Sequence, residues 1–358
     1  MYLKKQMLFL AFLCAFGCNS ATQNASTSKP IPDSLSIYTG SFETALKEAR
    51  TSSRHLVAII SKKDCPPCDM LQEYVKKDFA IRRYANDYLF YLFDETAGTD
   101  WLNQCFYITA SPTAIIFSPQ GALETIITGT RKDIYPKILD GVISKDTSAM
   151  YAGSKTRASI EGIKLISVLR KSYQAYRSAS QKDTTLTAAL EQAHAQYPYF
   201  YNTYQLSKRY ALEGDTVKAR WFAKKALDHN SPPELMLYQS LRNEMKTFLF
   251  PHYDIAKEPH ITFDQHSLDL GTFPLQQKKE IVFTLKNTGH KPLRLRDVIV
   301  SCSCLSIDWP RENIMPGGSG EIKATYNISK EGSFSQYAYV ISNAVNSAEL
   351  LTIKGRVN

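Results

Sequence analysis

The chain has 358 residues, which is too long for one ordinary domain, so two or three domains are expected. Hydrophobic residues make up 44% and charged residues 22%, a composition that excludes a disordered chain and permits sizeable cores. The net charge of +9 comes from Lys and Arg spread along the chain, without a basic tract interleaved with aromatic residues. This pattern favours a solvated basic surface, and no nucleic-acid partner is predicted.

The amino-terminal residues have the pattern of an export signal. Lys4 and Lys5 precede the apolar run MLFLAFLCAFG, which is too short to remain as a membrane-spanning helix. The run stops at Cys18 and resembles the lipobox of bacterial lipoproteins, in which this cysteine is acylated and becomes the first mature residue. We predict a lipoprotein signal peptide at residues 1–17 and lipid attachment at Cys18. A plain secretory signal that is cleaved nearby is the alternative.

The segment 18–38 is rich in Ser, Thr, Asn and Pro and is predicted to be a flexible tether. The chain would then be lipid-anchored in the bacterial cell envelope, either facing the periplasm or exposed on the surface. Disulfides are permitted in these compartments.

Residues 39–147 alternate between helical and strand patterns. Apolar spacing predicts helices at 42–53, 69–85, 100–108 and 132–144, and short apolar runs predict strands at 55–61, 88–94, 111–121 and 122–129. Such alternation predicts an α/β domain whose sheet is covered by helices on both faces.

Residues 155–250 show helical patterns alone. The stretch 201–233 resembles one tetratricopeptide unit, with small residues at the packing positions and Gly214-Asp215 at the turn between two helices. One unit is too little for a peptide-binding groove, so a helical spacer is predicted.

Residues 259–358 alternate apolar and polar residues in short runs that are separated by Gly, Asn and Pro, which predicts a β-sandwich of immunoglobulin-like size. The pattern LGTF, F.LKNTG, SCSC and PGGSGEI resembles a family known as domain of unknown function 1573, whose members occur in exported bacterial proteins. Ser303 stands where that family usually has Gly. The overall expectation is a multidomain α/β, α and β protein.

The run SKKDCPPCDML places Cys65 and Cys68 after a predicted strand and at the start of a predicted helix, which is the arrangement of a redox-active dithiol. Unpaired N–H groups and the helix macrodipole favour a thiolate at the first cysteine, and the second cysteine lies one turn deeper. Pro67 fits the first helical turn, where no hydrogen bond is lost. Lys63 favours the thiolate and Asp64 opposes it.

Together with ITASPTAIIF and Gly129 after the next strand, this motif resembles exported thioredoxin-like domains, especially the terminal domain of transmembrane disulfide-reductant carriers. The resemblance implies a cis-proline at Pro112, with Ser111 and Pro67 contributing to substrate binding. It also implies catalysis by Cys65 and Cys68 and electron supply by a membrane carrier.

The chain departs from thioredoxins at three positions. Asp64 replaces the usual aromatic residue before the first cysteine. The positions at which thioredoxins have a buried acid and its lysine partner fall near Ile59 and Tyr91, so both ionisable residues are lost. Without this acid–lysine pair, proton transfer from the resolving cysteine must use water or another group.

Other interpretations of the cysteines stay open. Cys65 and Cys68 could form a purely structural disulfide, whereas a zinc site lacks two further ligands. Cys105 fits a buried small hydrophobe. Cys302 and Cys304 are expected on one strand, facing the same side, as packed thiols, a labile disulfide or a copper(I) site. Exchange between this secondary thiol pair and Cys65 is a further hypothesis.

The sequence thus predicts a membrane-tethered thiol–disulfide oxidoreductase, more specifically a disulfide reductase, that acts on disulfide-containing proteins and needs no cofactor or metal. The alternative is a lipoprotein adaptor or binding protein with a vestigial thioredoxin fold. The two differ in whether Cys65 reacts selectively and whether function survives its replacement.

Overall fold

The computed structural model describes residues 30–62, 65–94, 100–151, 160–178, 182–275, 277–327 and 330–358. The predicted signal peptide and Cys18 lie outside the described residues. Residues 32–358 form one compact unit. None of the helices in the described ranges combines the length and the apolar character that a membrane span requires.

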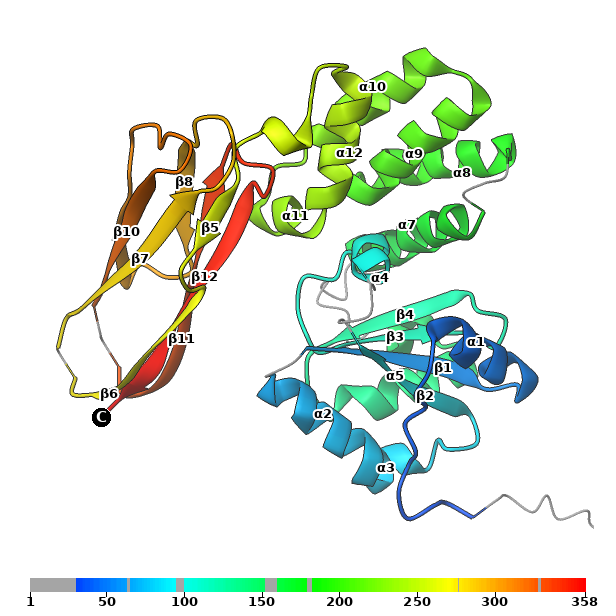
Figure 1. Ribbon diagram of the computed structural model, residues 1–358. Coiled ribbons are helices and arrows are strands. Elements are labelled where there is room, and N and C mark those ends of the chain that lie inside the picture. The colour runs from blue at the N-terminus through cyan, green and yellow to red at the C-terminus, as the bar shows by residue number, and fades with distance from the viewer. Residues whose placement is uncertain are drawn as a thin grey trace, which may run out of the picture. The chain divides into compact units, whose positions relative to one another are not determined.

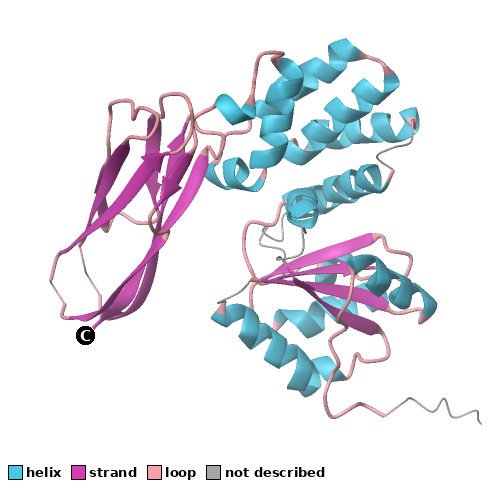
Figure 2. Cartoon of the chain, viewed as in Figure 1, coloured by secondary structure: helices cyan, strands magenta, loops and turns pink. Residues whose placement is uncertain are grey.

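The first folded region is the predicted sheet covered by helices (Figures 1 and 2). Its four strands lie in the order β2-β1-β3-β4, with β1 and β2 parallel and the other neighbours antiparallel. The elements are α1 (Phe42–Thr51), β1 (His55–Ser61), α2 (Pro66–Lys77), α3 (Phe79–Arg82), β2 (Tyr88–Asp94), α4 (Asp100–Cys105), β3 (Thr113–Phe117), β4 (Leu123–Thr128), α5 (Ile134–Ser144) and α6 (Thr147–Met150).

The central strands β1 and β3 are buried on both faces, which explains their continuous apolar runs. On one face Ile59 packs with side chains of α2 and α5. On the other face Ala58 and Ile60 pack with side chains of α1 and α4. The prediction of helices on both faces is confirmed.

The predicted tether ends earlier than residue 38. Leu35 is buried and its N–H donates to the Lys76 carbonyl at 2.9 Å, while the Tyr38 N–H donates to the Phe90 carbonyl at 2.7 Å. Residues 32–38 therefore pack along α2 and β2. The polar composition of 18–38 as a whole conceals the two side chains, Leu35 and Tyr38, that fix its last part.

The middle region is helical, as predicted. It contains α7 (Ile160–Arg177), α8 (Thr184–Gln196), α9 (Phe200–Glu213), α10 (Thr216–Leu227), α11 (Pro232–Leu237) and α12 (Gln239–Leu249), followed by the short 3-10 helix Ile255–Lys257. α9 and α10 form the expected helical pair, and Gly214 ends α9 with a φ of 90°. Ser207 on α9 donates to the Ala219 carbonyl on α10 at 2.9 Å, so small residues bring the two helices close together. The tetratricopeptide likeness beyond this pair stays a prediction.

The helical region also packs against the sheet domain. Arg170 on α7 donates from Nε to the Leu123 carbonyl on β4 at 2.9 Å. The hydroxyls of Tyr199 and Tyr238 donate to the carbonyls of Cys105 and Gln104 at the end of α4, each at 3.0 Å. Side chains from both regions share one buried cluster. The region therefore covers one face of the domain in addition to following it in sequence.

The last region consists of two four-stranded sheets, in the orders β5-β7-β10-β9 and β6-β12-β11-β8. Among the described strands of this last region, β6 and β12 pair in parallel and the other neighbours are antiparallel. Alternate residues such as Phe283, Leu285 and Leu351 fill the core. The strands are β5 (Ile261–Phe263), β6 (Ser267–Phe273), β7 (Lys279–Asn287), β8 (Leu295–Val300), β9 (Leu305–Asp308), β10 (Ser319–Tyr326), β11 (Gly332–Ser342) and β12 (Ala348–Val357).

Candidate active site and a second disulfide

Strand register brings the cysteine motif and the Pro112 loop to the same edge of the sheet. β1 ends at Ser61, four residues before Cys65. β3 runs antiparallel to β1, with Thr113 opposite Ile60, so Pro112 comes immediately before the residue that pairs with the end of β1. Ile60 and Thr113, which are 53 positions apart in sequence, are thus neighbours through backbone pairing.

Cys65 is the N-cap residue of α2, and Pro66 and Pro67 form its exposed first turn. Cys68 is completely buried, whereas Cys65 is half-buried. The two cysteines form a disulfide with a Cα–Cα distance of 5.3 Å. The Cys68 N–H donates to the Cys65 carbonyl at 2.8 Å, which places Cys68 in the first turn of the helix behind Cys65. Lys63 and Asp64 lie outside the described residues.

The Ser111–Pro112 peptide bond is cis, as the resemblance implied. The loop is held from both sides. The Gly129 N–H donates to the Pro112 carbonyl at 2.9 Å, and the Thr113 hydroxyl donates to the Ala110 carbonyl at 2.7 Å. Ser111 is half-buried, and its hydroxyl has no hydrogen-bond partner among the described residues.

Two tyrosines that the sequence did not single out support this loop. The Tyr135 hydroxyl on α5 donates to the Gly129 carbonyl at 3.0 Å, and the Tyr74 hydroxyl on α2 donates to the Lys132 carbonyl at 2.9 Å. The two rings pack edge to face, with their centroids 6.2 Å apart. Burial raises the pKa of both hydroxyls, so they remain donors at neutral pH. No sequence signal short of the fold would have identified them, because their acceptors are backbone carbonyls.

Among the described residues of the sheet domain, no buried acid–lysine pair like that of thioredoxins is present. Ile59 is completely buried on the α2 side of the sheet. Tyr91 was expected to mark the lysine position, but it packs on the opposite face; the residue paired with Ile59 is Leu92. Neither Tyr91 nor Leu92 is a lysine, so the lysine partner is missing at both positions. Among the described residues of 42–140, none of the buried side chains is a carboxylate.

Cys105 is completely buried at the end of α4, and desolvation raises its thiol pKa well above the usual value. The interpretation of Cys105 as a packed hydrophobe is confirmed. In the described ranges, no three His, Cys, Asp or Glu side chains gather in a way that would hold a metal ion.

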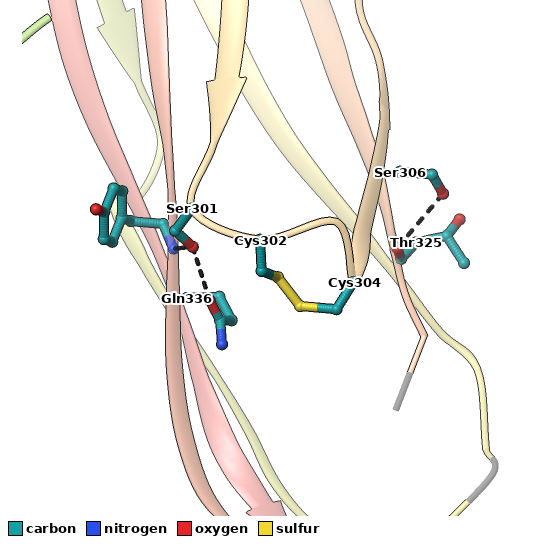
Figure 3. The surroundings of a disulfide bond; sticks show 7 residues. Ser301, Cys302, Cys304, Ser306, Thr325 and Gln336 are labelled. Atoms are coloured by element: carbon teal, nitrogen blue, oxygen red, sulfur yellow. Dashed lines mark hydrogen bonds between the residues drawn. A yellow bond between two sulfur atoms is a disulfide. The ribbon is translucent and has the colours of Figure 1, made fainter. Parts of the chain in front are cut away.

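Cys302 and Cys304 form a second disulfide, with a Cα–Cα distance of 5.1 Å (Figure 3). The prediction that both lie on a strand is wrong, because residues 301–304 form a turn between β8 and β9. Of the alternatives left open, the structure shows the disulfide rather than packed thiols or a metal site.

Two families match the chain. Residues 42–140 match the thioredoxin-like domain family, and residues 261–357 match a family described as protein of unknown function (DUF1573). Both family resemblances are confirmed, so residues 42–140 are a thioredoxin-like domain. No curated protein matches the chain.

Solved structures resemble parts of the chain. A protein of unknown function from Porphyromonas gingivalis W83 is 21% identical with a TM-score of 0.27, over 30% of this chain and 50% of that one. This chain thus spans half of that protein's length. A thioredoxin-fold protein from Helicobacter pylori is 12% identical with a TM-score of 0.25, over 33% of this chain and 84% of that one. The DsbH oxidoreductase is 15% identical with a TM-score of 0.25, over 36% of this chain and 93% of that one.

Proposed function

We propose that this chain is an exported, membrane-tethered thiol–disulfide oxidoreductase that reduces disulfides in proteins. The observation that carries the proposal is the position of Cys65 and Cys68. One lies half-buried at the N-terminus of α2, the other lies buried one turn behind it, and the two are joined as a disulfide at the sheet edge that also carries Pro112.

The first step is attack by Cys65 on a substrate disulfide. The orphan N–H groups and the positive end of the α2 dipole favour the thiolate, which is the nucleophilic form. Attack forms a mixed disulfide between Cys65 and one substrate sulfur, and the other substrate sulfur leaves as a thiolate that takes a proton from water.

The second step is resolution by Cys68. Its thiolate attacks the Cys65 sulfur, forms the Cys65–Cys68 bond and releases the second substrate thiol. Two electrons pass to the substrate, and the enzyme ends as the disulfide that the structure contains. Because Ile59 and Leu92 beside this helix are apolar, water or another group would accept the Cys68 proton.

Substrate would bind across the edge where the two motifs meet. Pro67 is exposed in front of the cysteines, and Ser111 and Pro112 lie at the start of β3. An extended substrate segment placed along this loop would bring its disulfide to Cys65. The loop anchors at Gly129 and Thr113 would keep that surface fixed when substrate leaves.

The cellular setting follows from the amino-terminal sequence. A lipid on Cys18 would hold the chain at the membrane, and a transmembrane electron carrier would return the Cys65–Cys68 pair to the dithiol. The resemblance to domains of such carriers supports the direction of reduction.

The test uses the mature chain with its disulfides reduced and the excess reductant removed, mixed with insulin as a protein disulfide substrate. We expect interchain reduction of insulin by the wild type and none by Cys65→Ser. Cys68→Ser should accumulate a mixed disulfide between Cys65 and insulin, identified by peptide mass spectrometry. Cys105→Ala is the matched control and should retain activity, because that thiol is buried and its pKa is raised. Equal activity of the wild type and Cys65→Ser would support the adaptor instead.

A further inference from the structure

We propose that the Cys302–Cys304 disulfide is a second exchange centre, which accepts electrons from the Cys65–Cys68 dithiol. This inference rests on the proposed function for its electron donor. The evidence for the acceptor comes from the β-sandwich alone.

The disulfide is poorly placed to act as a structural staple. It joins two residues with one between them, so it constrains the unfolded chain less than a bridge across a long loop would. It also links no two strands, because both cysteines belong to the same turn between β8 and β9. Stabilisation of the sandwich therefore does not explain why the pair is oxidised.

Backbone contacts outside the disulfide hold both ends of the turn. Before it, the Ser301 N–H donates to the Tyr337 carbonyl on β11 at 2.8 Å, and the Ser301 hydroxyl donates to the Gln336 side-chain oxygen at 2.7 Å (Figure 3). After it, the Asn327 N–H donates to the Cys304 carbonyl at 2.8 Å. These contacts tie the turn to both sheets.

Reduction would leave these anchors in place. The two cysteines would stay close together as a dithiol and could form the bond again without refolding of the sandwich. The turn can thus hold the pair both as a disulfide and as a dithiol, which is the property required of an exchange centre. Small-ring disulfides are, in addition, the more easily reduced ones.

The turn that carries the disulfide is partly exposed. Cys302 and Cys304 are half-buried and pack against the core of the sandwich, whereas Ser303 between them is exposed and Cys105 is completely buried. In the exchange, a thiolate would approach the disulfide from the side of Ser303.

The exchange needs no further reactant. The Cys65 thiolate attacks one sulfur of the Cys302–Cys304 bond, and the other sulfur leaves as a thiolate and is protonated. Cys68 then loses its proton to water and attacks the Cys65 sulfur. The products are a Cys65–Cys68 disulfide and a Cys302/Cys304 dithiol, so two electrons have moved from the first pair to the second.

The first test compares the two pairs in the wild-type chain at equilibrium with glutathione buffers, using differential alkylation and peptide mass spectrometry. At the ratio that half-reduces Cys65–Cys68, we expect Cys302–Cys304 to be at least about tenfold more reduced than oxidised, a difference of about 30 mV. If Cys302–Cys304 stays oxidised where Cys65–Cys68 is fully reduced, the inference is overturned.

The second test traps the transfer. In Cys68→Ser, with Cys302–Cys304 oxidised, we expect a mixed disulfide from Cys65 to Cys302 or Cys304, and its loss when Cys302→Ser/Cys304→Ser is added. The Cys302→Ser/Cys304→Ser variant in which Cys65 and Cys68 are intact should still reduce insulin. Insulin reduction without the mixed disulfide would overturn the inference and leave the proposed function standing. If the chain does not reduce insulin but glutathione reduces Cys302–Cys304, the proposed function fails. Cys65–Cys68 is then not the electron donor, and the inference fails with it.

Discussion

Removing the carboxylate from the first turn of α2 should increase the fraction of Cys65 that is ionised. Asp69 is exposed, lies four residues after Cys65 and donates its N–H to the Cys65 carbonyl at 3.2 Å. Residues four apart on a helix have Cβ atoms about 5–6 Å apart. At that separation in water, Coulomb's law gives about 0.7–0.8 kcal/mol, which is about a three- to fourfold change in an ionisation equilibrium.

The assay is the ultraviolet absorbance of the thiolate in the reduced Cys68→Ser chain, corrected with Cys65→Ser/Cys68→Ser. At a pH where a minority of Cys65 is ionised, Asp69→Asn should raise the thiolate fraction by about three- to fourfold in low salt. The effect should shrink in 1 M salt, where the Debye length is about 3 Å.

Glu73→Gln is the matched control, because Glu73 lies a further turn away and pairs with Lys77 at 2.6 Å. It should change the thiolate fraction much less. An equal effect of both variants, or no effect of Asp69→Asn, would contradict the idea that local charge at the start of α2 controls Cys65.

Three further predictions concern stability. Tyr199→Phe should lower the free energy of unfolding by about 1–3 kcal/mol in denaturant titrations, because the Cys105 carbonyl loses its buried hydrogen-bond donor. An unchanged free energy would mean that the helical region does not pack on α4 as described. Gly141→Ala should lower the melting temperature, since its Cβ would lie 2.6 Å from the Ala149 side chain; an unchanged temperature would contradict the close packing of α5 and α6. Burial lowers the pKa of His55, so as pH falls below about 6.5 the unfolded chain binds a proton at His55 more readily than the folded chain, and stability is lost. His55→Gln should reduce this loss of stability between pH 7.5 and 5.5. Identical stability profiles of the variant and the wild type would contradict a lowered pKa for His55.

Much of the thioredoxin-like domain follows from the sequence because its signals are local. Buried strands such as 55–61 and 88–94 are continuous apolar runs, and within a helix a proline pair is tolerated only in the first turn. Pro112 was identified from its motif, and the strand register then placed it at the cysteine edge. The supporting tyrosines were missed because side chain-to-backbone bonds across the fold leave no pattern in the sequence.

The errors have a common physical origin in tertiary pairing. The run that contains Cys302 and Cys304 keeps its apolar character across a turn, and only the contacts to Tyr337 and Asn327 show where one strand ends and the next begins. Similarly, Leu35 lies in a mostly polar segment, and it is buried because side chains of α2 pack against it.

The most direct test of the proposed activity is the reduction potential of the Cys65–Cys68 pair in the mature chain, measured by equilibration with glutathione. A disulfide reductase requires a value near that of thioredoxin, about −270 mV. A value near −120 mV would identify an oxidant and contradict the proposed direction. A pair that cannot be reduced without unfolding the domain would contradict thiol–disulfide exchange altogether.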